Sequence, residues 1–231
     1  MTSRTALIAG ANGLVGSHLL HLLLADESYK KVRALVRRAL PIEHPKLDQR
    51  IIDFDSLELH AQVVSGNDVF CCLGTTMKKA GSKAAFEKVD FTYPYEIAKI
   101  ARVNGATQFL VVTAIGADPH SSVFYNRVKG RIEEAVTKLP YRAVHVFRPS
   151  LLHGDRQASR PLETLGIFAM RLAAFAMVGR SKKYRPIQAA TVAQAVLNIA
   201  RKNLHGIHVY ESDQIQTIGS ETTHDVLSDS A

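Results

Sequence analysis

The chain lacks several features that would restrict it to specialised classes of protein. It contains no tryptophan and only two cysteines, the neighbours Cys71 and Cys72. A disulfide between adjacent cysteines would not link distant parts of the chain, so a secreted domain stabilised by disulfides is excluded. No apolar run approaches the ~18 residues that cross a bilayer, and the first residues carry no signal-peptide pattern. We therefore expect a soluble protein of a reducing compartment, located in the cytoplasm, with no membrane span.

Recognition of nucleic acid or metal ions finds little support in the composition. The formal net charge is +8, but basic residues are mostly mixed with acidic ones. One dense basic run occupies residues 180–185, and interleaved stacking aromatics are nearly absent from the basic segments, so we expect no nucleic acid partner. The ten histidines are scattered without ligand-like spacing, and we expect no metal site. A small-molecule substrate is the expected partner.

Strand-like and helix-like segments alternate along the chain, and 46% of the residues are hydrophobic, enough for one sizeable core. We expect strands at residues 5–9, 32–36, 51–52, 68–72, 108–113, 142–147 and 207–210. We expect helices at residues 14–23, 57–64, 92–104, 122–138, 162–178 and 189–201, and a loop at residues 74–83. Strands separated by helices pair in parallel with right-handed crossovers. The pattern predicts an α/β protein with a doubly wound parallel sheet, the Rossmann fold.

A glycine-rich loop connects the first expected strand to the first expected helix: Gly10-Ala11-Asn12-Gly13-Leu14-Val15-Gly16. In such a loop the first glycine permits a tight turn, the second lets the backbone approach a pyrophosphate, and the third allows close helix–sheet packing. The helix N-terminus then attracts the phosphates. A tight turn without a ligand is the alternative, but the strand–turn–helix setting favours a dinucleotide site.

The domain organisation follows from the chain length of 231 residues and from a change in the segment pattern after Pro149. We expect one NAD(P)-binding domain over residues 1–231. Its core would occupy residues 5–150, a small extension on the substrate side residues 151–211, and a polar, partly loose tail residues 212–231. Either a monomer or a homodimer is compatible with the expected helix at residues 162–178.

The second expected strand ends at Arg37 and Arg38, about 20 residues beyond the glycine loop. An NAD site usually places an acidic residue there for the ribose 2′-hydroxyl, whereas an NADP site places an arginine for the 2′-phosphate. A guanidinium binds a phosphate bidentately, and a carboxylate repels it. The arginines therefore favour NADP(H), with a solvated arginine pair as the alternative.

Tyr125 and Lys129 form a YxxxK motif on an expected helix, where positions i and i+4 share a face. Free tyrosine is a poor base at neutral pH because its pKa is ~10, but a nearby lysine cation favours the tyrosinate. Tyr125 would then exchange a proton with a carbonyl or alcohol oxygen. An ordinary surface pair is the alternative interpretation of the motif.

Taken together, these motifs resemble the short-chain dehydrogenase/reductase superfamily, whose extended and atypical branches use the GxxGxxG spacing. Further matches are Cys72-Leu73-Gly74-Thr75-Thr76, residues 112–118, residues 125–130 and residues 147–161. This set is similar to the atypical group of Tat-interacting oxidoreductase-like proteins and their bacterial NAD(P)-binding relatives, over about residues 5–200. The resemblance implies an NADP-binding Rossmann domain with oxidoreductase activity, but fold resemblance does not fix a substrate.

The resemblance also assigns roles to individual residues. It implies that Asp53 and Phe54 flank the adenine, and that Lys129 holds the nicotinamide ribose. Thr113 takes the place of the usual serine that polarises the substrate oxygen. The asparagine of many such sites has no clear counterpart, and Asp90 lies in the corresponding region. Two further segments would contact the cofactor: Cys72, Leu73, Gly74 and Thr75 along the ribose and pyrophosphate, and Pro149, Ser150 and Leu151 beside the nicotinamide.

Three functions follow from these expectations. The leading hypothesis is an NADP(H)-dependent oxidoreductase of an unknown small carbonyl or alcohol substrate, with Tyr125, Lys129 and Thr113 as catalytic residues. The alternative is a redox-sensing interaction module that binds NADP(H) with little or no turnover. An epimerase or dehydratase that uses the cofactor transiently is the third hypothesis, which the short C-terminal region disfavours.

Overall fold

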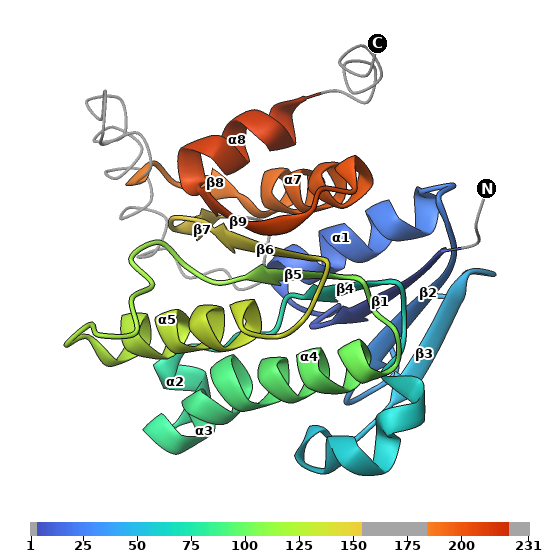
Figure 1. The fold of residues 1–231 in the computed structure, drawn as a ribbon, viewed down its shortest axis with the longest axis horizontal. Helices are drawn as coiled ribbons and strands as arrows, with labels where there is room; N and C mark the ends of the chain where they lie inside the picture. Colours follow the sequence, from blue (N-terminus) through green and yellow to red (C-terminus); the bar gives the residue numbers. More distant parts are fainter. Residues whose placement is uncertain (1–3, 154–183, 222–231) are drawn as a thin grey trace.

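The computed structural model describes residues 4–153 and 184–221, and these residues form a sheet covered by helices on both faces (Figure 1). Seven parallel strands of the described chain pair in the order β3-β2-β1-β4-β5-β6-β9. The strands are β1 (Arg4–Ala9), β2 (Tyr29–Val36), β3 (Leu47–Ile51), β4 (Asp68–Cys71), β5 (Gln108–Val112), β6 (Ala143–Arg148) and β9 (Gly206–Glu211). The doubly wound parallel sheet expected from the alternating pattern is confirmed.

Two helical layers sandwich the sheet. The main helices are α1 (Leu14–Ala25), α4 (Tyr93–Val103), α5 (Phe124–Thr137), α7 (Ala189–Lys202) and α8 (Ser212–Ser220). Helices α1 and α7 cover one face, and α4 and α5 cover the other (Figure 1). Shorter elements are α2 (Met77–Ala80), α3 (Lys83–Glu87), a 3₁₀-helical segment (Phe54–Val63), a π-helical turn (Lys88–Thr92) and the small strand pair β7 (Leu152–His153) and β8 (Ile187–Gln188).

The side chains of β1 show why this chain forms a two-layered core. Successive residues of a strand point to opposite faces. Ala6 and Ile8 join the apolar cluster under α1 and α7, while Leu7 and Ala9 join the cluster under α4 and α5. All four residues are completely buried. A strand buried on both faces is typical of parallel sheets, in which helices cover each side.

The strand order reverses at β1, and this reversal fixes where a ligand binds. From β1 the chain passes to β2 and β3 on one side, and then to β4, β5 and β6 on the other. Connections leave the carboxyl ends of β1 and β4 in opposite directions, which opens a crevice between them. Open α/β sheets bind their ligands in the crevice at this switch point.

The structure differs from the expected elements in several places. The strand expected at 51–52 is the longer β3, and the expected 74–83 loop contains α2, which ends at Gly81 in the left-handed conformation. The helix expected at 92–104 begins as a π-helical turn from Lys88. The helix expected at 162–178 lies outside the described residues.

The expectation of a loose polar tail from Ser212 is wrong for residues 212–220, which form α8. The side chains of Glu211 and Gln214 form a reciprocal capping box that satisfies backbone amides at the start of this helix. Ile215 is fully buried and belongs to the apolar cluster that includes residues of α1 and α7. One buried apolar side chain and a strong cap therefore outweigh the polar composition of the segment.

Candidate active site

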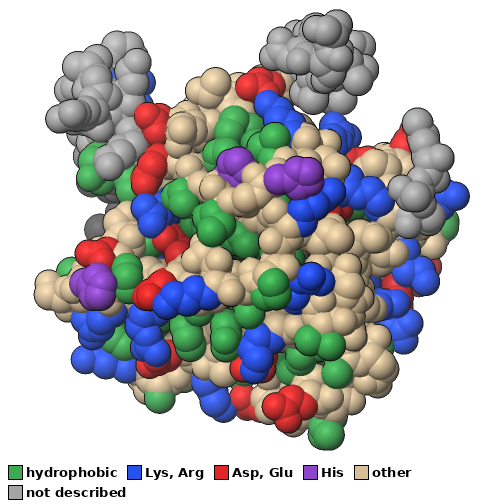
Figure 2. Space-filling model, in the orientation of Figure 1, with side chains coloured by type: hydrophobic (Ala, Val, Ile, Leu, Met, Phe, Trp, Pro, Cys, Tyr) green, Lys and Arg blue, Asp and Glu red, His purple; other side chains and the backbone are tan. Residues whose placement is uncertain are grey.

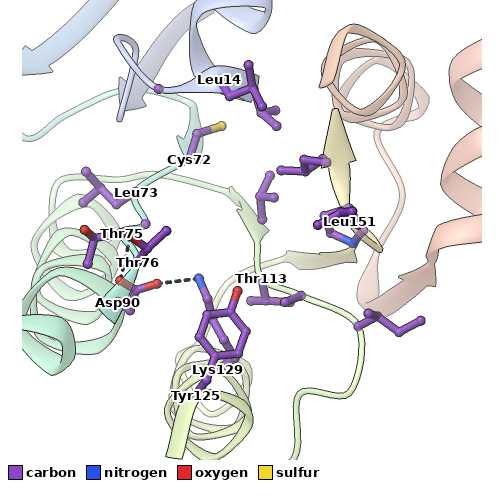
Figure 3. A pocket seen from close by; sticks show the side chains of 18 of the residues that line it. Leu14, Cys72, Leu73, Thr75, Thr76, Asp90, Thr113, Tyr125, Lys129 and Leu151 are labelled. Atoms are coloured by element: carbon purple, nitrogen blue, oxygen red, sulfur yellow. Dashed lines mark hydrogen bonds and ion pairs between the residues drawn. The ribbon is translucent and has the colours of Figure 1, made fainter. Parts of the chain in front are cut away.

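Two adjoining cavities lie at the carboxyl ends of the strands, around the switch point. The larger has a volume of about 480 Å³ and the smaller about 90 Å³. Gly13, Cys72, Leu73 and Gly74 line both, so the two cavities lie on opposite sides of these residues. Figure 3 shows side chains around a pocket that β4, β5 and α5 surround with the first turn of α1. The shape suits an extended ligand with two ends of different character.

The glycine loop forms the wall between the two cavities. Gly10 has a φ of +86°, and a Cβ added there would lie 2.5 Å from the carbonyl oxygen of Cys72. A Cβ at Gly16 would lie 2.1 Å from the carbonyl oxygen of Gly10. Both positions therefore require glycine. The first turn of α1 follows at once, and its amides have no partner within the helix, so the loop fits a diphosphate.

The remaining loop residues are distributed between the two cavities. Gly10 and Asn12 line the smaller cavity, Leu14 and Val15 line the larger, and Gly13 lines both. Gly16 lines neither, because it serves the packing of α1 against the loop.

The smaller cavity has an aromatic wall and a cation at its edge. The rings of Phe54 and Tyr93 lie with their centroids 5.6 Å apart, and Arg37 lines the same cavity from the end of β2. Arg38 and Asp53 line neither cavity. The Asp53 carboxylate instead accepts a hydrogen bond from the Asp55 amide at the start of the 3₁₀-helical segment. Tyr93 was not singled out from the sequence, because only the fold brings it opposite Phe54.

Tyr125 and Lys129 lie one turn apart on α5 and line the larger cavity (Figure 3). The Tyr125 ring packs against Phe86 with centroids 5.6 Å apart, while Lys129 is buried. The spacing of the YxxxK motif therefore places a phenol and an ammonium in one cavity, with the glycine loop on another wall.

Asp90 is the counter-ion of Lys129. Its carboxylate lies 2.8 Å from the Lys129 ammonium, and its second oxygen accepts a hydrogen bond of 2.9 Å from the Thr75 amide. Burial alone would lower the pKa of Lys129. Nearby groups, first among them the Asp90 carboxylate, raise this pKa by more than burial lowers it, so the pKa of Lys129 lies above its usual value. The sequence placed Asp90 in the right region, but its pairing required the π-helical turn that carries it.

Thr113 directly follows β5, and its hydroxyl faces two acceptors. Thr113 Oγ1 lies 2.6 Å from a carboxylate oxygen of Glu133 and 3.2 Å from the carbonyl oxygen of Phe147. Glu133 is buried on α5 and forms an ion pair with Arg148. The sequence analysis missed Glu133, although positions 125, 129 and 133 share a helix face and the i+8 spacing was a usable signal.

The far wall of the larger cavity is formed by the chain after β6 and β5. Pro149, Ser150 and Leu151 line it, as the resemblance implied, and Thr75 lines the opposite wall. Other lining residues were not singled out from the sequence: Thr76, Lys79, Val112, Ala114, Ile115 and Leu152. Burial raises the pKa of the Cys72 thiol, which disfavours the thiolate form that nucleophilic chemistry needs.

Within residues 4–153 and 184–221, no three histidine, cysteine or acidic side chains gather as a metal site. No helix of that part of the chain has the length and apolar character needed to cross a membrane. Basic and acidic side chains are interspersed on the face shown in Figure 2.

The sheet is parallel, a glycine loop lies at its switch point, and this loop lines the cavity that contains Tyr125 and Lys129. These features define a dinucleotide-binding protein of the Rossmann class. Comparisons with known proteins narrow this class. A family model described as NAD(P)H-binding matches residues 10–150. The chain belongs to this NAD(P)H-binding family and binds NAD(P), and its resemblance to the atypical short-chain dehydrogenases/reductases is confirmed.

Two relatives illustrate the similarity in sequence. Protein HTATIP2 of Rattus norvegicus is 39% identical over 169 residues, which are 71% of this chain and 69% of the relative. Protein FMP52-1, mitochondrial, of Scheffersomyces stipitis is 31% identical over 206 residues, 86% of this chain and 89% of the relative. The second alignment extends the similarity over most of both chains.

Solved structures share the fold at low sequence identity. The enzyme WbmH of Bordetella bronchiseptica, in complex with NAD⁺, superposes with a TM-score of 0.68 at 18% identity, covering 91% of this chain and 76% of its own. A short chain dehydrogenase family protein of Francisella tularensis gives 0.67 at 14% identity, covering 92% and 99%. At these identities the likeness concerns the fold alone.

The expected cytoplasmic location is wrong. Relatives from several yeasts, among them Scheffersomyces stipitis and Candida albicans, are named mitochondrial proteins. The expectation depended on the absence of a signal-peptide pattern and of a membrane span, and neither absence distinguishes the cytosol from the interior of an organelle.

Proposed function

We propose that this protein is an NADP(H)-dependent oxidoreductase that interconverts a small carbonyl compound and the corresponding alcohol. The observation that carries the proposal is the position of Tyr125 and Lys129 in the cavity that begins at the glycine loop. NADPH, when bound, supplies a hydride to the carbonyl carbon of the substrate. The residues of the chain must then bind the cofactor, place the substrate and deliver one proton.

Tyr125 is the proposed acid and base. During reduction its hydroxyl gives a proton to the substrate oxygen, and during oxidation the tyrosinate takes that proton back. The Lys129 ammonium stabilises the tyrosinate by its positive charge. An ion pair with Asp90, with 2.8 Å between the charged groups, holds Lys129 in place. The lysine is therefore oriented before any ligand binds.

The glycine loop and the chain after β4 are the proposed cofactor contacts. Gly10, Gly13 and the first amides of α1 would hold the diphosphate, and Cys72, Leu73, Gly74 and Thr75 would line the ribose and pyrophosphate. Lys129 would hold the nicotinamide ribose, with Pro149, Ser150 and Leu151 beside the nicotinamide. Phe54 and Tyr93 would enclose the adenine, since they form the wall of the smaller cavity.

Arg37 supports a preference for NADP(H) over NAD(H). It lines the smaller cavity beside Val36, at the end of β2. A guanidinium at this place would bind a 2′-phosphate through charge-assisted hydrogen bonds. Arg38 is exposed and outside both cavities, so we assign the preference to Arg37 alone.

The test is NADPH oxidation measured against a panel of aldehydes and ketones. Tyr125→Phe is expected to lower turnover at least 100-fold while the dissociation constant for NADPH changes less than threefold. Tyr95→Phe is the matched control and is expected to retain activity, because this half-buried tyrosine of α4 lines neither cavity. NADPH binding without turnover on any panel member would reject the oxidoreductase and favour a cofactor-binding interaction module.

A further inference from the structure

The hydroxyl of Thr113 has two neighbours that only accept hydrogen bonds. They are a carboxylate oxygen of Glu133 at 2.6 Å and the backbone carbonyl oxygen of Phe147 at 3.2 Å. A threonine hydroxyl carries one proton and two lone pairs. Its proton must point to one of these two acceptors, so only lone pairs remain toward the cavity that Thr113 lines.

The Glu133 carboxylate is the stronger of the two acceptors. Arg148 Nε lies 3.1 Å from each oxygen of this carboxylate, and its guanidinium pairs with it as an ion. The hydrogen bond to Glu133 is the largest cause that raises the pKa of Arg148. Hydrogen bonds to a charged acceptor are shorter and stronger than those to a neutral carbonyl. The Thr113 proton therefore points to Glu133.

Arg148 is itself fixed by a second carboxylate. Its guanidinium lies 3.2 Å from Glu211, which ends β9 and caps α8. The carboxylates of Glu133 and Glu211 come from different elements and converge on one cation. Glu133 cannot turn away from Thr113 without leaving Arg148, so α5, β6 and the start of α8 together set the direction of one hydroxyl.

We propose that Glu133 and Arg148 are positioning residues that turn the Thr113 proton away from the cavity, so that Thr113 accepts hydrogen bonds there and does not donate them. This inference rests on the proposed function for its catalytic consequence. Tyr125 is then the sole proton donor of the Thr113–Tyr125 pair toward a carbonyl oxygen. A ligand group beside Thr113 must bring its own O–H or N–H. The role that the resemblance implies for Thr113, polarising the substrate oxygen, is reversed.

Neutron diffraction on deuterium-exchanged crystals of the protein tests the hydroxyl direction without any activity. The expected result is a deuteron on Thr113 Oγ1 that points to Glu133. A deuteron directed into the cavity, or one bound to the Glu133 carboxylate, would overturn the inference. This measurement remains decisive even if no panel substrate is turned over, so its failure is distinguishable from failure of the proposed function.

A double-mutant comparison tests the role of Glu133 in catalysis. In the wild type, Thr113→Val is expected to lower kcat/KM for carbonyl reduction less than threefold. In Glu133→Gln the amide oxygen faces Arg148, because a guanidinium only donates, and the amide nitrogen donates to Thr113. The freed Thr113 proton then turns to a substrate oxygen in the cavity, because the Phe147 carbonyl oxygen, 3.2 Å from the hydroxyl, already accepts the Thr113 amide at 2.8 Å. Adding Thr113→Val to Glu133→Gln is therefore expected to lower kcat/KM at least tenfold, mainly through kcat.

Glu134→Gln is the matched control background. Glu134 is the exposed neighbour of Glu133 and pairs only with Lys138 among the described residues, so Thr113→Val should remain nearly neutral in it. Two outcomes would overturn the proposal. One is a tenfold or larger loss for Thr113→Val in the wild type, and the other is the same small loss in all three backgrounds.

Discussion

The carboxylate of Asp90 lies 2.8 Å from the ammonium of Lys129, and both side chains are almost completely removed from solvent. The second oxygen of Asp90 accepts a hydrogen bond from the Thr75 amide. A single buried carboxylate thus joins the proposed catalytic helix α5 to the chain after β4, which lines both cavities. The ion pair makes the proton-transfer side and the cofactor side of the site one structural unit.

Removing the charge of Asp90 is expected to destabilise the protein strongly. Asp90→Asn leaves the Lys129 ammonium buried without a counter-ion, and breaking a buried pair in this way costs about 3 kcal/mol or more. The double variant Asp90→Asn/Lys129→Met removes the orphaned charge and is expected to recover most of the loss. Urea unfolding measures both free energies. Equal stability of Asp90→Asn and wild type would contradict a buried, charged pair.

Acid is expected to destabilise the fold through His145. Burial lowers the pKa of His145 to about 4, helped by His208, which stacks on it at 5.1 Å. Tyr210 is the other neighbour, with its hydroxyl 3.3 Å from Nδ1 of His145. The unfolded chain takes up the proton near pH 6.5, and the folded chain only near pH 4. The contribution of neutral His145 to the free energy of unfolding is therefore complete above pH 6.5, and it is lost as the pH falls toward 4.

The loss amounts to about 3 kcal/mol, since each unit of pKa difference is worth about 1.4 kcal/mol. His145→Gln is expected to flatten the pH dependence of the unfolding free energy between pH 6.5 and 4.5. His120→Gln, at an exposed position, serves as the control and should keep the wild-type slope. Identical slopes in all three proteins would show that His145 does not titrate in this window.

Arg37 is expected to decide between the two cofactors. Arg37→Ala should weaken NADPH binding by about tenfold to a hundredfold, the worth of a charge-assisted hydrogen bond. NADH binding should change little, because NADH lacks the 2′-phosphate. Arg38→Ala is the matched control and should leave both affinities unchanged. Calorimetry at low salt measures them, and tighter binding of NADH than NADPH by the wild type would reject the arginine argument.

The glycine loop and the YxxxK motif could be located from the sequence because each works through local geometry. Gly16 is required by a short contact to Gly10 within one strand–turn–helix unit, and Gly10 by its positive φ in the turn. Tyr125 and Lys129 are placed by the helical repeat. The alternation of strand-like and helix-like segments along the chain likewise predicted the order of strands and helices, and hence the parallel sheet. These features depend on neighbours within a few residues, and the sequence contains that information directly.

Contacts between distant segments could not be predicted in the same way. Asp90 lies in a π-helical turn, which no hydrophobic periodicity predicts. Its ion pair with Lys129 joins the connection between β4 and β5 to the connection between β5 and β6. The Thr113–Glu133–Arg148 contacts join three elements. Helix α8 was missed because its stability comes from a cap and one buried isoleucine, although its composition is polar.

Transfer of a label from cofactor to product tests the central claim most directly. NADPH carrying deuterium at the transferred position of its nicotinamide is incubated with the protein and an aldehyde or ketone from the panel, and the alcohol is analysed by mass spectrometry. The account predicts one deuterium on the alcohol carbon for each NADPH consumed, with the rate at least 100-fold lower in Tyr125→Phe. Alcohol without deuterium, or an undiminished rate in Tyr125→Phe, would contradict it.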